Sequence, residues 1–321
     1  MYFVGVDLGA TNIRTVVSDE TAKILGRAQD ETPHGPTGKA VTDTVLRVVR
    51  EACDHAGVQP TDIDGAGIAS MGTMDATARV ITVPANVSTE IGSIPLVDPL
   101  STILDTDNVH LRNDTVAGVI GERFYTYPSA ENLVYITISS GIGVGIIADG
   151  DVISGRDGNA GEMGHMTIDV HGFMECGCGQ DGHWEAYCSG NNIPQFVRAL
   201  HQENPVETAL PIDRPEFSAK HLFEHSGTDA FADHVIDRLA HFNTVGVANI
   251  VHAYDPAAIS IGGAVALNNP EHVIEPIKSR LDEAVLVEPP EINLSEQGSQ
   301  VVLKGALTLA VTNGTEIQPP A

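Results

Sequence analysis

The sequence predicts an α/β protein built from two related halves. Near the start, strands at residues 2–8 and 13–19 are joined by the small-residue turn GATN. The same pattern returns at residues 132–139 and 143–153, where a glycine turn joins the strands. With 321 residues, of which 42% are hydrophobic, the chain is long enough for two domains with sizeable cores.

The expected elements of each half follow in chain order. In the first half we expect strands at 2–8, 13–19, 24–32, 64–70 and 108–114, helices at 36–56 and 115–125, and an irregular stretch around Pro84, Pro95 and Pro99. In the second half we expect strands at 132–139, 143–153 and 257–265, mainly helix at 191–255, a helix at 272–286, and a short strand leading into a final helix at 301–313. The helix at 36–56 is amphipathic, because its valines at 41, 45, 48 and 49 fall on one face.

The acidic composition excludes two classes of partner. The chain has 43 acidic against 17 basic residues, only five of them lysines, and a formal net charge of −26. Nucleic acids and anionic membrane surfaces both require clustered Lys and Arg, so neither is expected as a partner. The balance favours a protein adapted to a high-salt cytoplasm, where screening weakens self-repulsion; an ordinary acidic enzyme is the alternative.

The sequence gives no sign of membrane insertion or secretion. No run of 18 apolar residues occurs, and the N-terminus has no basic region followed by a cleavage site. We therefore expect a cytoplasmic protein.

Four metal-type side chains lie close together among glycines in the second half. His165, Cys176, Cys178 and His183 occur within nineteen positions, and thiolate and imidazole are the ligands that zinc prefers. A closed set of four ligands has no open position for catalysis, so we expect a structural Zn²⁺. Cys188 is the alternative fourth ligand, although its helical context favours a buried thiol.

Three glycine-containing turns are candidate nucleotide sites. DLGATN places an acid before small residues, whose N–H groups suit phosphate, while the acid suits Mg²⁺. SSGIG at 139–143 is a second cradle, and the glycine pair after the strand AISI is a place where a flat ring can approach. Each is also a common structural turn.

Asn113 and Asp114 stand where a strand ends and a helix begins. Asp114 is interpretable as the helix N-cap or as a general base. The residues alone leave both open.

Taken in order, DLGATN, RND, SSGIGVG, GNAGEMGH, CGCGQDGHWE and IGGAV resemble the ROK family of sugar kinases and regulators, and the resemblance covers essentially the whole chain. It implies the actin-like ATPase (ribonuclease H-like) duplication, with two α/β domains around a cleft. Residues 1–114, joined by the final helix at about 304–321, would form the small domain, and residues 115–303 the large one with the zinc segment. We also expect a homodimer or homotetramer.

The resemblance implies roles for particular residues. Nucleotide and Mg²⁺ would be held by Asp7, Gly9, Thr11, Asn12, Ser140, Gly141, Gly143, Gly262 and Gly263. Sugar would be bound by Asn86, Asn113, Asp114, Glu162, His165 and Glu185, with Asp114 as the base and one nitrogen of His165 on zinc. The chain departs from the family pattern in having His183 for a cysteine, Ser139 and Ala10 for glycines, and no Trp after Asn86.

The implied activity is ATP-dependent phosphorylation of the 6-hydroxyl of a hexose, glucose first. Alternatives within the family are N-acetylmannosamine, N-acetylglucosamine, fructose or a sugar acid as substrate. A sugar-responsive regulator is disfavoured, since only six residues precede Asp7 and the charge is acidic. A sugar-binding protein without activity is disfavoured by the presence of Asp114.

Overall fold

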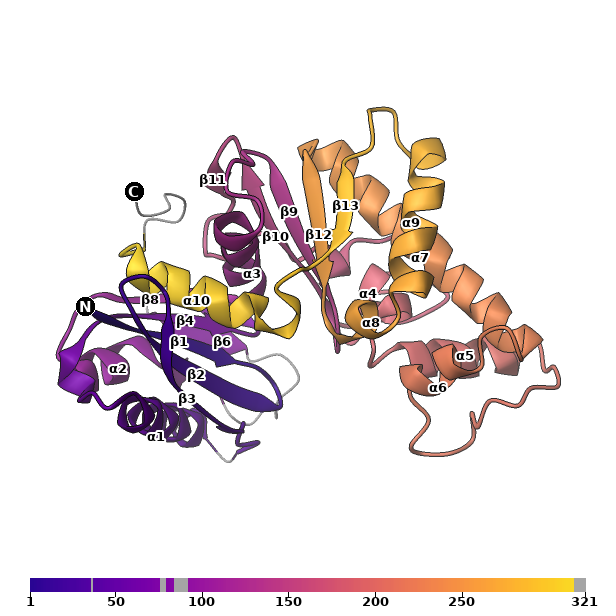
Figure 1. The fold of residues 1–321 in the computed structure, drawn as a ribbon. Coiled ribbons are helices and arrows are strands. Elements are labelled where there is room, and N and C mark those ends of the chain that lie inside the picture. The colour runs from indigo at the N-terminus through magenta and orange to yellow at the C-terminus, as the bar shows by residue number, and fades with distance from the viewer. Residues whose placement is uncertain (36, 76–78, 84–91, 315–321) are drawn as a thin grey trace. The chain divides into compact units, whose positions relative to one another are not determined.

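The computed structural model describes residues 1–35, 37–75, 79–83 and 92–314 (Figure 1). The chain divides into two compact units. The first comprises Met1–Glu131, Gly145–Gly161 and Gln300–Ala321, and the second comprises Asn132–Val144 and Glu162–Ser299. The predicted division at residues 114 and 303 stays a prediction.

The first unit contains a five-stranded sheet of order β3-β2-β1-β4-β8. Its strands are β1 (Tyr2–Leu8), β2 (Asn12–Asp19), β3 (Ile24–Glu31), β4 (Ile63–Ser70) and β8 (Val109–Asn113). The meander β1-β2-β3 is antiparallel, whereas β1, β4 and β8 are parallel to one another. Parallel neighbours bring their carboxyl ends to one edge, and the register aligns Leu8 with Ser70 and Ser70 with Asn113.

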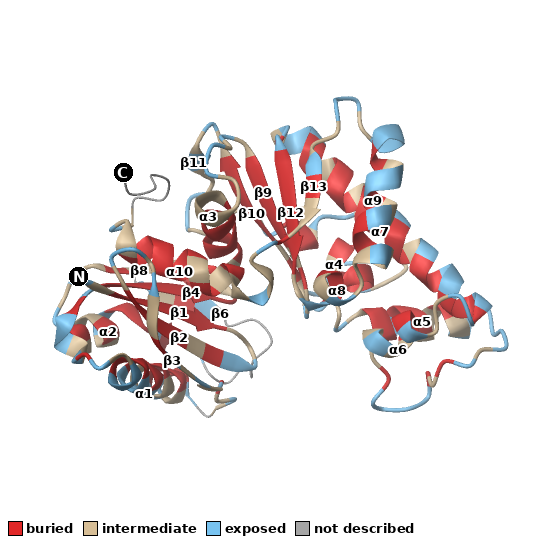
Figure 2. Cartoon of the chain, in the orientation of Figure 1, coloured by how far each residue is buried: buried red, intermediate tan, exposed pale blue. Residues whose placement is uncertain are grey.

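Helices cover both faces of this sheet. Successive strand residues point to opposite sides, so the apolar residues of one strand contribute to two separate cores. Val4 and Val6 belong to the core shared with α1 (Gly38–Ala56) and α2 (Val97–Leu104), whereas Phe3 packs against α10 (Val301–Val311). Figure 2 shows the buried strands and the one buried side of α1. Helix α3 (Asp114–Tyr125) follows β8 directly and packs against α10.

A second five-stranded sheet has the order β11-β10-β9-β12-β13. Its strands are β9 (Leu133–Ile138), β10 (Ile142–Ala148), β11 (Asp151–Val152), β12 (Ala258–Gly262) and β13 (Glu291–Leu294). Strands β9, β12 and β13 are parallel, as β1, β4 and β8 are in the first sheet. Both sheets therefore place three sequential strands on one side and two later strands on the other, which confirms the predicted pair of related halves.

Helices make up much of the second unit. They are α4 (Trp184–Cys188), α5 (Ile193–Glu203), α6 (Ala219–Glu224), α7 (Ala230–Tyr254), α8 (Ala264–Asn268) and α9 (Pro270–Ala284). Helix α7 is the longest of them and packs against both α4 and α9. This packing fixes α4, which carries Glu185.

Two sequence expectations need correction. Residues 301–311 are helical from the first residue, so the short strand predicted there is wrong, and the last strand, β13, lies earlier. The stretch predicted as irregular contains α2 and a three-stranded sheet formed by β5 (Thr73–Asp75), β6 (Val80–Val83) and β7 (Ile94–Pro95). Of the helices that the structure describes, none is both long and apolar enough to cross a membrane.

Candidate functional site

The four predicted metal ligands converge. The ligand atoms of His165, Cys176, Cys178 and His183 all lie within 4.8 Å of one another. Nδ1 of His165 is 3.6 Å from Sγ of Cys176, and Nδ1 of His183 is 3.3 Å from Sγ of Cys178. Ligands held 2.0–2.3 Å from a tetrahedral ion are separated by roughly 3.3–3.8 Å, so both distances suit zinc.

Local structure brings these residues together from separate elements. His165 ends a short 3₁₀ helix (Met163–His165), and His183 directly precedes α4. Between them a tight turn carries the cysteines, in which the Gly179 N–H donates to the carbonyl of Cys176 at 2.8 Å. Cys188 is not part of the cluster; it is buried, with Sγ 3.7 Å from the carbonyl oxygen of Leu239.

Two carboxylates lie beside this cluster. Oε2 of Glu162 is 3.9 Å from Nε2 of His165, the ring nitrogen not directed at Cys176. Partial loss of contact with water raises the pKa of Glu162, whose side chain is still 43% exposed; His165 opposes that rise and Glu185 adds to it. Burial also lowers the pKa of His183, with a smaller contribution from His165, which favours the neutral imidazole that binds metals. Glu162, His165 and Glu185 thus form one polar group next to the candidate metal site.

The first predicted phosphate turn, between β1 and β2, is held by hydrogen bonds. The Gly9 N–H donates to the carbonyl of Asn12 at 3.0 Å, and the hydroxyl of Thr32 donates to the carbonyl of Gly9 at 2.7 Å. Thr11 and Asn12 are exposed, while Asp7 at the end of β1 is 9% exposed. Thr32 was not predicted, because its partners are 21 and 23 residues away and nothing local in the sequence marks them.

Burial raises the pKa of Asp7 to about 6, and Arg14, whose Nε is 3.9 Å from Oδ2, opposes that rise. A carboxyl whose folded-state pKa exceeds its unfolded value of 3.8 binds protons more tightly in the folded chain. Its ionisation therefore destabilises the fold, with no cost below about pH 4 and the full cost above about pH 6.

We expect Asp7→Asn to raise the free energy of unfolding at neutral pH by about 2–3 kcal/mol, from roughly two pKa units at 1.36 kcal/mol each. Chemical denaturation of wild type and variant from pH 4 to pH 8, at constant salt and without nucleotide, measures the difference. The surface variant Asp151→Asn, which also removes one negative charge, is the control. The prediction would be contradicted if the difference in free energy of unfolding between Asp7→Asn and wild type did not change from pH 4 to pH 8.

The second predicted turn lies between β9 and β10. The N–H of Ser139 donates to the carbonyl of Gly141 at 2.9 Å, and the N–H of Gly190 donates to the carbonyl of Ser139 at 2.6 Å. In the parallel register Gly262 pairs with Thr137, so the glycine pair at the end of β12 lies at the same sheet edge as this turn. Close packing also explains why both positions are glycine. A Cβ on Gly262 would meet the Tyr135 ring, and one on Gly263, whose φ is +87°, would meet the backbone of Ile138.

Asn113, and not Asp114, is the N-cap of α3. Oδ1 of Asn113 accepts hydrogen bonds from the backbone N–H of Thr115 at 2.9 Å and from the Thr115 hydroxyl at 2.6 Å. Nδ2 of Asn113 donates to the carbonyl of Gly72 at 3.2 Å. Asp114 is the half-buried first residue of the helix. The N-cap interpretation of Asp114 is thus wrong. Since Asn113 is aligned through Ser70 with Leu8, Asp114 and the first turn lie at one sheet edge, roughly 10 Å apart for two strand spacings.

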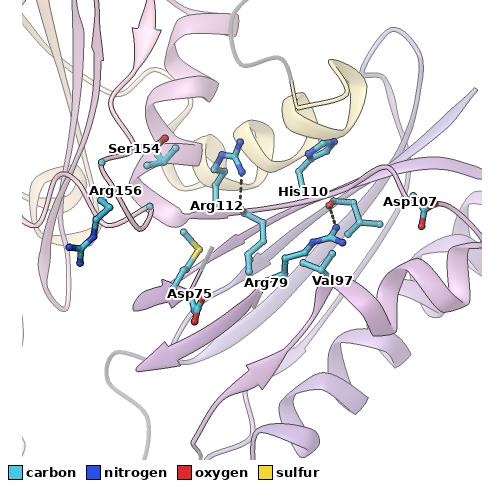
Figure 3. Close-up of a pocket in the computed structure, with 14 residues that line it drawn as sticks. Asp75, Arg79, Val97, Asp107, His110, Arg112, Ser154 and Arg156 are labelled. Carbon is cyan, nitrogen blue, oxygen red and sulfur yellow. Dashed lines mark hydrogen bonds between the residues drawn. The ribbon is translucent and has the colours of Figure 1, made fainter. Parts of the chain in front are cut away.

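A cavity of about 440 Å³ lies elsewhere in the first unit, beside the edge strand β8 (Figure 3). Nη2 of Arg79 donates to the carbonyl of Val109 at 3.0 Å, and Nη1 of Arg112 donates to that of Leu111 at 3.1 Å. Both guanidinium groups thereby cap carbonyls of the edge strand. Figure 3 shows Arg156 pointing away from them, so the cations do not converge on one point. None of the predicted site residues lines this cavity.

The structure thus groups the predicted residues within each unit. The first contains Asp7, the first turn, Asn113 and Asp114, and the second contains the metal cluster, Glu162, Glu185, the second turn and the glycine pair. Asn86 lies outside the described residues. The sequence analysis missed Gly72, whose carbonyl accepts the hydrogen bond from Nδ2 of Asn113. A glycine that closely follows a buried strand is the signal that could have identified it, and its φ of +82° is a backbone conformation that favours glycine.

Known proteins that are similar to this chain along most of their length include the following three. A glucokinase of Pyrobaculum calidifontis is 35% identical over 308 residues, which cover 96% of this chain and 94% of that protein. An N-acetylmannosamine kinase of Yersinia pestis is 31% identical over 266 residues, covering 82% of this chain and 83% of that protein. The crystal structure of a ROK family glucokinase from Streptomyces griseus in complex with glucose and AMPPNP is 27% identical, with a TM-score of 0.79 over 97% of this chain and 100% of that one.

These likenesses confirm the actin-like ATPase fold that the sequence predicts. The family model for ROK proteins matches residues 3–313, nearly the whole chain. The chain belongs to the ROK family.

Proposed function

We propose that this protein is an ATP-dependent hexose kinase that phosphorylates the 6-hydroxyl of glucose. The observation that carries the proposal is the position of Asp114. Asn113 caps α3, and Asp114 stands at the helix N-terminus at the same sheet edge as the acid and small residues of the first turn. A phosphoryl transferase needs this combination of a phosphate-binding turn and one carboxylate that accepts a hydroxyl proton.

In the proposed reaction, Asp114 takes the proton of the 6-hydroxyl as that oxygen attacks the γ-phosphorus of ATP. The bond from this phosphorus to the β–γ bridging oxygen breaks, so the products are the sugar 6-phosphate and ADP. Backbone N–H groups of the first turn (Gly9, Thr11, Asn12) and of the second (Ser140, Gly141, Gly143) bind phosphate oxygens. Asp7 would hold Mg²⁺, which neutralises phosphate charge, and the Gly262–Gly263 pair accommodates the adenosine.

The polar group at the metal cluster is proposed to bind the sugar. Glu162 and Glu185 accept hydrogen bonds from hydroxyls, and His165 offers Nε2 while Nδ1 belongs to the cluster. His165, Cys176, Cys178 and His183 would hold Zn²⁺, which supplies a structural clamp and no chemistry. The donor set of two thiols and two imidazoles fits that ion. We further propose that the protein assembles as a homodimer or homotetramer, and light scattering of the purified protein gives the molar mass that decides.

Relatives include both glucokinases and N-acetylmannosamine kinases, so the choice of glucose is argued from the charge of the sugar-binding group. The two carboxylates favour a neutral polyhydroxyl ligand, since a sugar acid would meet like charges. A site that matches each hydroxyl also rejects sugars that lack one.

We therefore expect kcat/KM for glucose to exceed that for N-acetylmannosamine and N-acetylglucosamine moderately, and that for 2-keto-3-deoxygluconate by at least about 10²-fold. An ADP-release assay with MgATP, run at one salt concentration and including mannose and fructose, measures these ratios. A tenfold lead of an N-acetylated sugar would replace glucose as substrate but leave the kinase mechanism intact. A leading sugar acid would overturn the charge argument, and no ADP release with any sugar would overturn the proposed function.

We also propose that the protein is adapted to high salt. With 43 acidic residues and five lysines, surface charges repel one another strongly in dilute buffer, and salt near 2 M shortens the Debye length to about 2–3 Å. The melting temperature and kcat/KM should both rise between about 0.1 M and 2 M KCl. Calorimetry measures the melting temperature and the ADP-release assay measures kcat/KM across that range of KCl. A melting temperature that stays constant or falls would reject the adaptation to high salt.

A further inference from the structure

The carboxylate of Glu185 lies against the second phosphate turn. Its Oε2 accepts a hydrogen bond of 2.8 Å from the backbone N–H of Ile142, the first residue of β10. At the preceding position, a Cβ on Gly141 would lie 2.6 Å from the same oxygen, closer than real Cβ contacts occur. The carboxylate therefore reaches the turn only because residue 141 has no side chain.

Helix α4, which carries Glu185, is anchored on its other side. The ring of Trp184 is buried against Gly246 of α7, where a Cβ would overlap it, and its Nε1 donates to Oδ1 of Asn243 at 2.9 Å. Gly190, two residues after the end of α4, continues the link to the turn, since its N–H donates to the carbonyl of Ser139. The turn is thus fixed at both ends, by Glu185 of α4 and by Gly190 just after that helix.

We propose that Glu185 is a positioning residue for the nucleotide turn at 139–143, in addition to its proposed contact with sugar. One carboxylate oxygen orients the backbone around Gly141 and Ile142, and the other remains oriented by that bond for a sugar hydroxyl. Sugar and nucleotide affinities then share one side chain, and Gly141 is needed for both. This inference rests on the proposed function.

Two reciprocal variants test it on the full-length protein. Glu185→Ala removes the acceptor of the Ile142 N–H, and the dissociation constant for Mg·AMPPNP, measured by calorimetry without sugar, should rise about tenfold. Glu185→Gln keeps an amide oxygen at this place, so its constant should stay within about twofold of wild type. Gly141→Ala pushes the carboxylate aside, and its dissociation constant for glucose, measured without nucleotide, should rise about tenfold.

Ser140→Ala is the matched control, because it shortens an exposed side chain of the same turn and adds no atom that could displace the carboxylate of Glu185. Loss of the hydroxyl beside the phosphate-binding N–H groups should weaken AMPPNP binding, whereas glucose binding should stay unchanged. The inference is overturned if Glu185→Ala binds AMPPNP as tightly as wild type, if Glu185→Gln loses as much as Glu185→Ala, or if Gly141→Ala affects AMPPNP alone. A wild-type protein that binds neither ligand would instead refute the proposed function, so the two failures are distinct.

Discussion

Replacing Asp114 with asparagine is expected to lower kcat for glucose phosphorylation by at least about 10²-fold, the usual contribution of a general base. The amide has nearly the shape of the carboxylate but does not take up the proton of the 6-hydroxyl. The fold should survive, because Asn113 supplies the N-cap of α3. Loss of a negative charge from the first turn of the helix costs only about 0.3–1 kcal/mol of stability.

Steady-state kinetics with saturating glucose and MgATP measures kcat, and calorimetry measures the dissociation constant for glucose, which should change little. Asp98→Asn is a suitable control, since Asp98 occupies the first turn of another helix, α2, and its side chain is 86% exposed. A variant at Asp114 that retains a kcat within a few-fold of wild type would remove this residue from the role of base.

The two related halves could be predicted because their signals are local. Apolar strands joined by small residues mark both meanders, and the amphipathic spacing of the valines marks α1. The error at residue 301 has the opposite cause. The segment VVL has a β-branched start that favours a strand, but it lies in a helix packed against α3 so closely that a Cβ on Gly305 would overlap the backbone of Ala117. Tertiary packing overrides the local preference there.

The candidate site divides in the same way. The four metal-type ligands could be read from the sequence because the residue types themselves carry the chemistry and lie within nineteen positions. The contacts that orient the site join distant positions: Asn113 reaches Gly72 across 41 residues, and Glu185 reaches Ile142 across 43. No periodicity or local motif encodes such pairs, so only the fold reveals them.

Replacing Cys178 with alanine should abolish zinc binding. The cluster has four ligand atoms within 4.8 Å of one another, and the loss of a thiolate leaves an incomplete tetrahedral set. Structural zinc sites in peptides contribute about 10–16 kcal/mol to folding. Between His165 and His183 the chain forms no helix or strand, and isolated bridges join Thr167 to His183 and Glu175 to Asp181. The segment should therefore lose order without the ion, and KM for glucose should rise at least about tenfold because Glu162 and Glu185 flank it.

Elemental analysis of protein purified without chelator gives the zinc content, which should fall from one per chain in wild type to none in the variant. Cys188→Ala is the matched control, since that thiol is also in this part of the chain but lies outside the cluster, near the carbonyl of Leu239. It should keep its zinc. Wild-type protein without zinc would reject the metal site. If Cys188→Ala released zinc while His183→Ala retained it, the fourth ligand would be Cys188 and not His183. If Cys178→Ala lost its zinc but kept the wild-type KM, the ion would be present without holding the two carboxylates in place for the sugar.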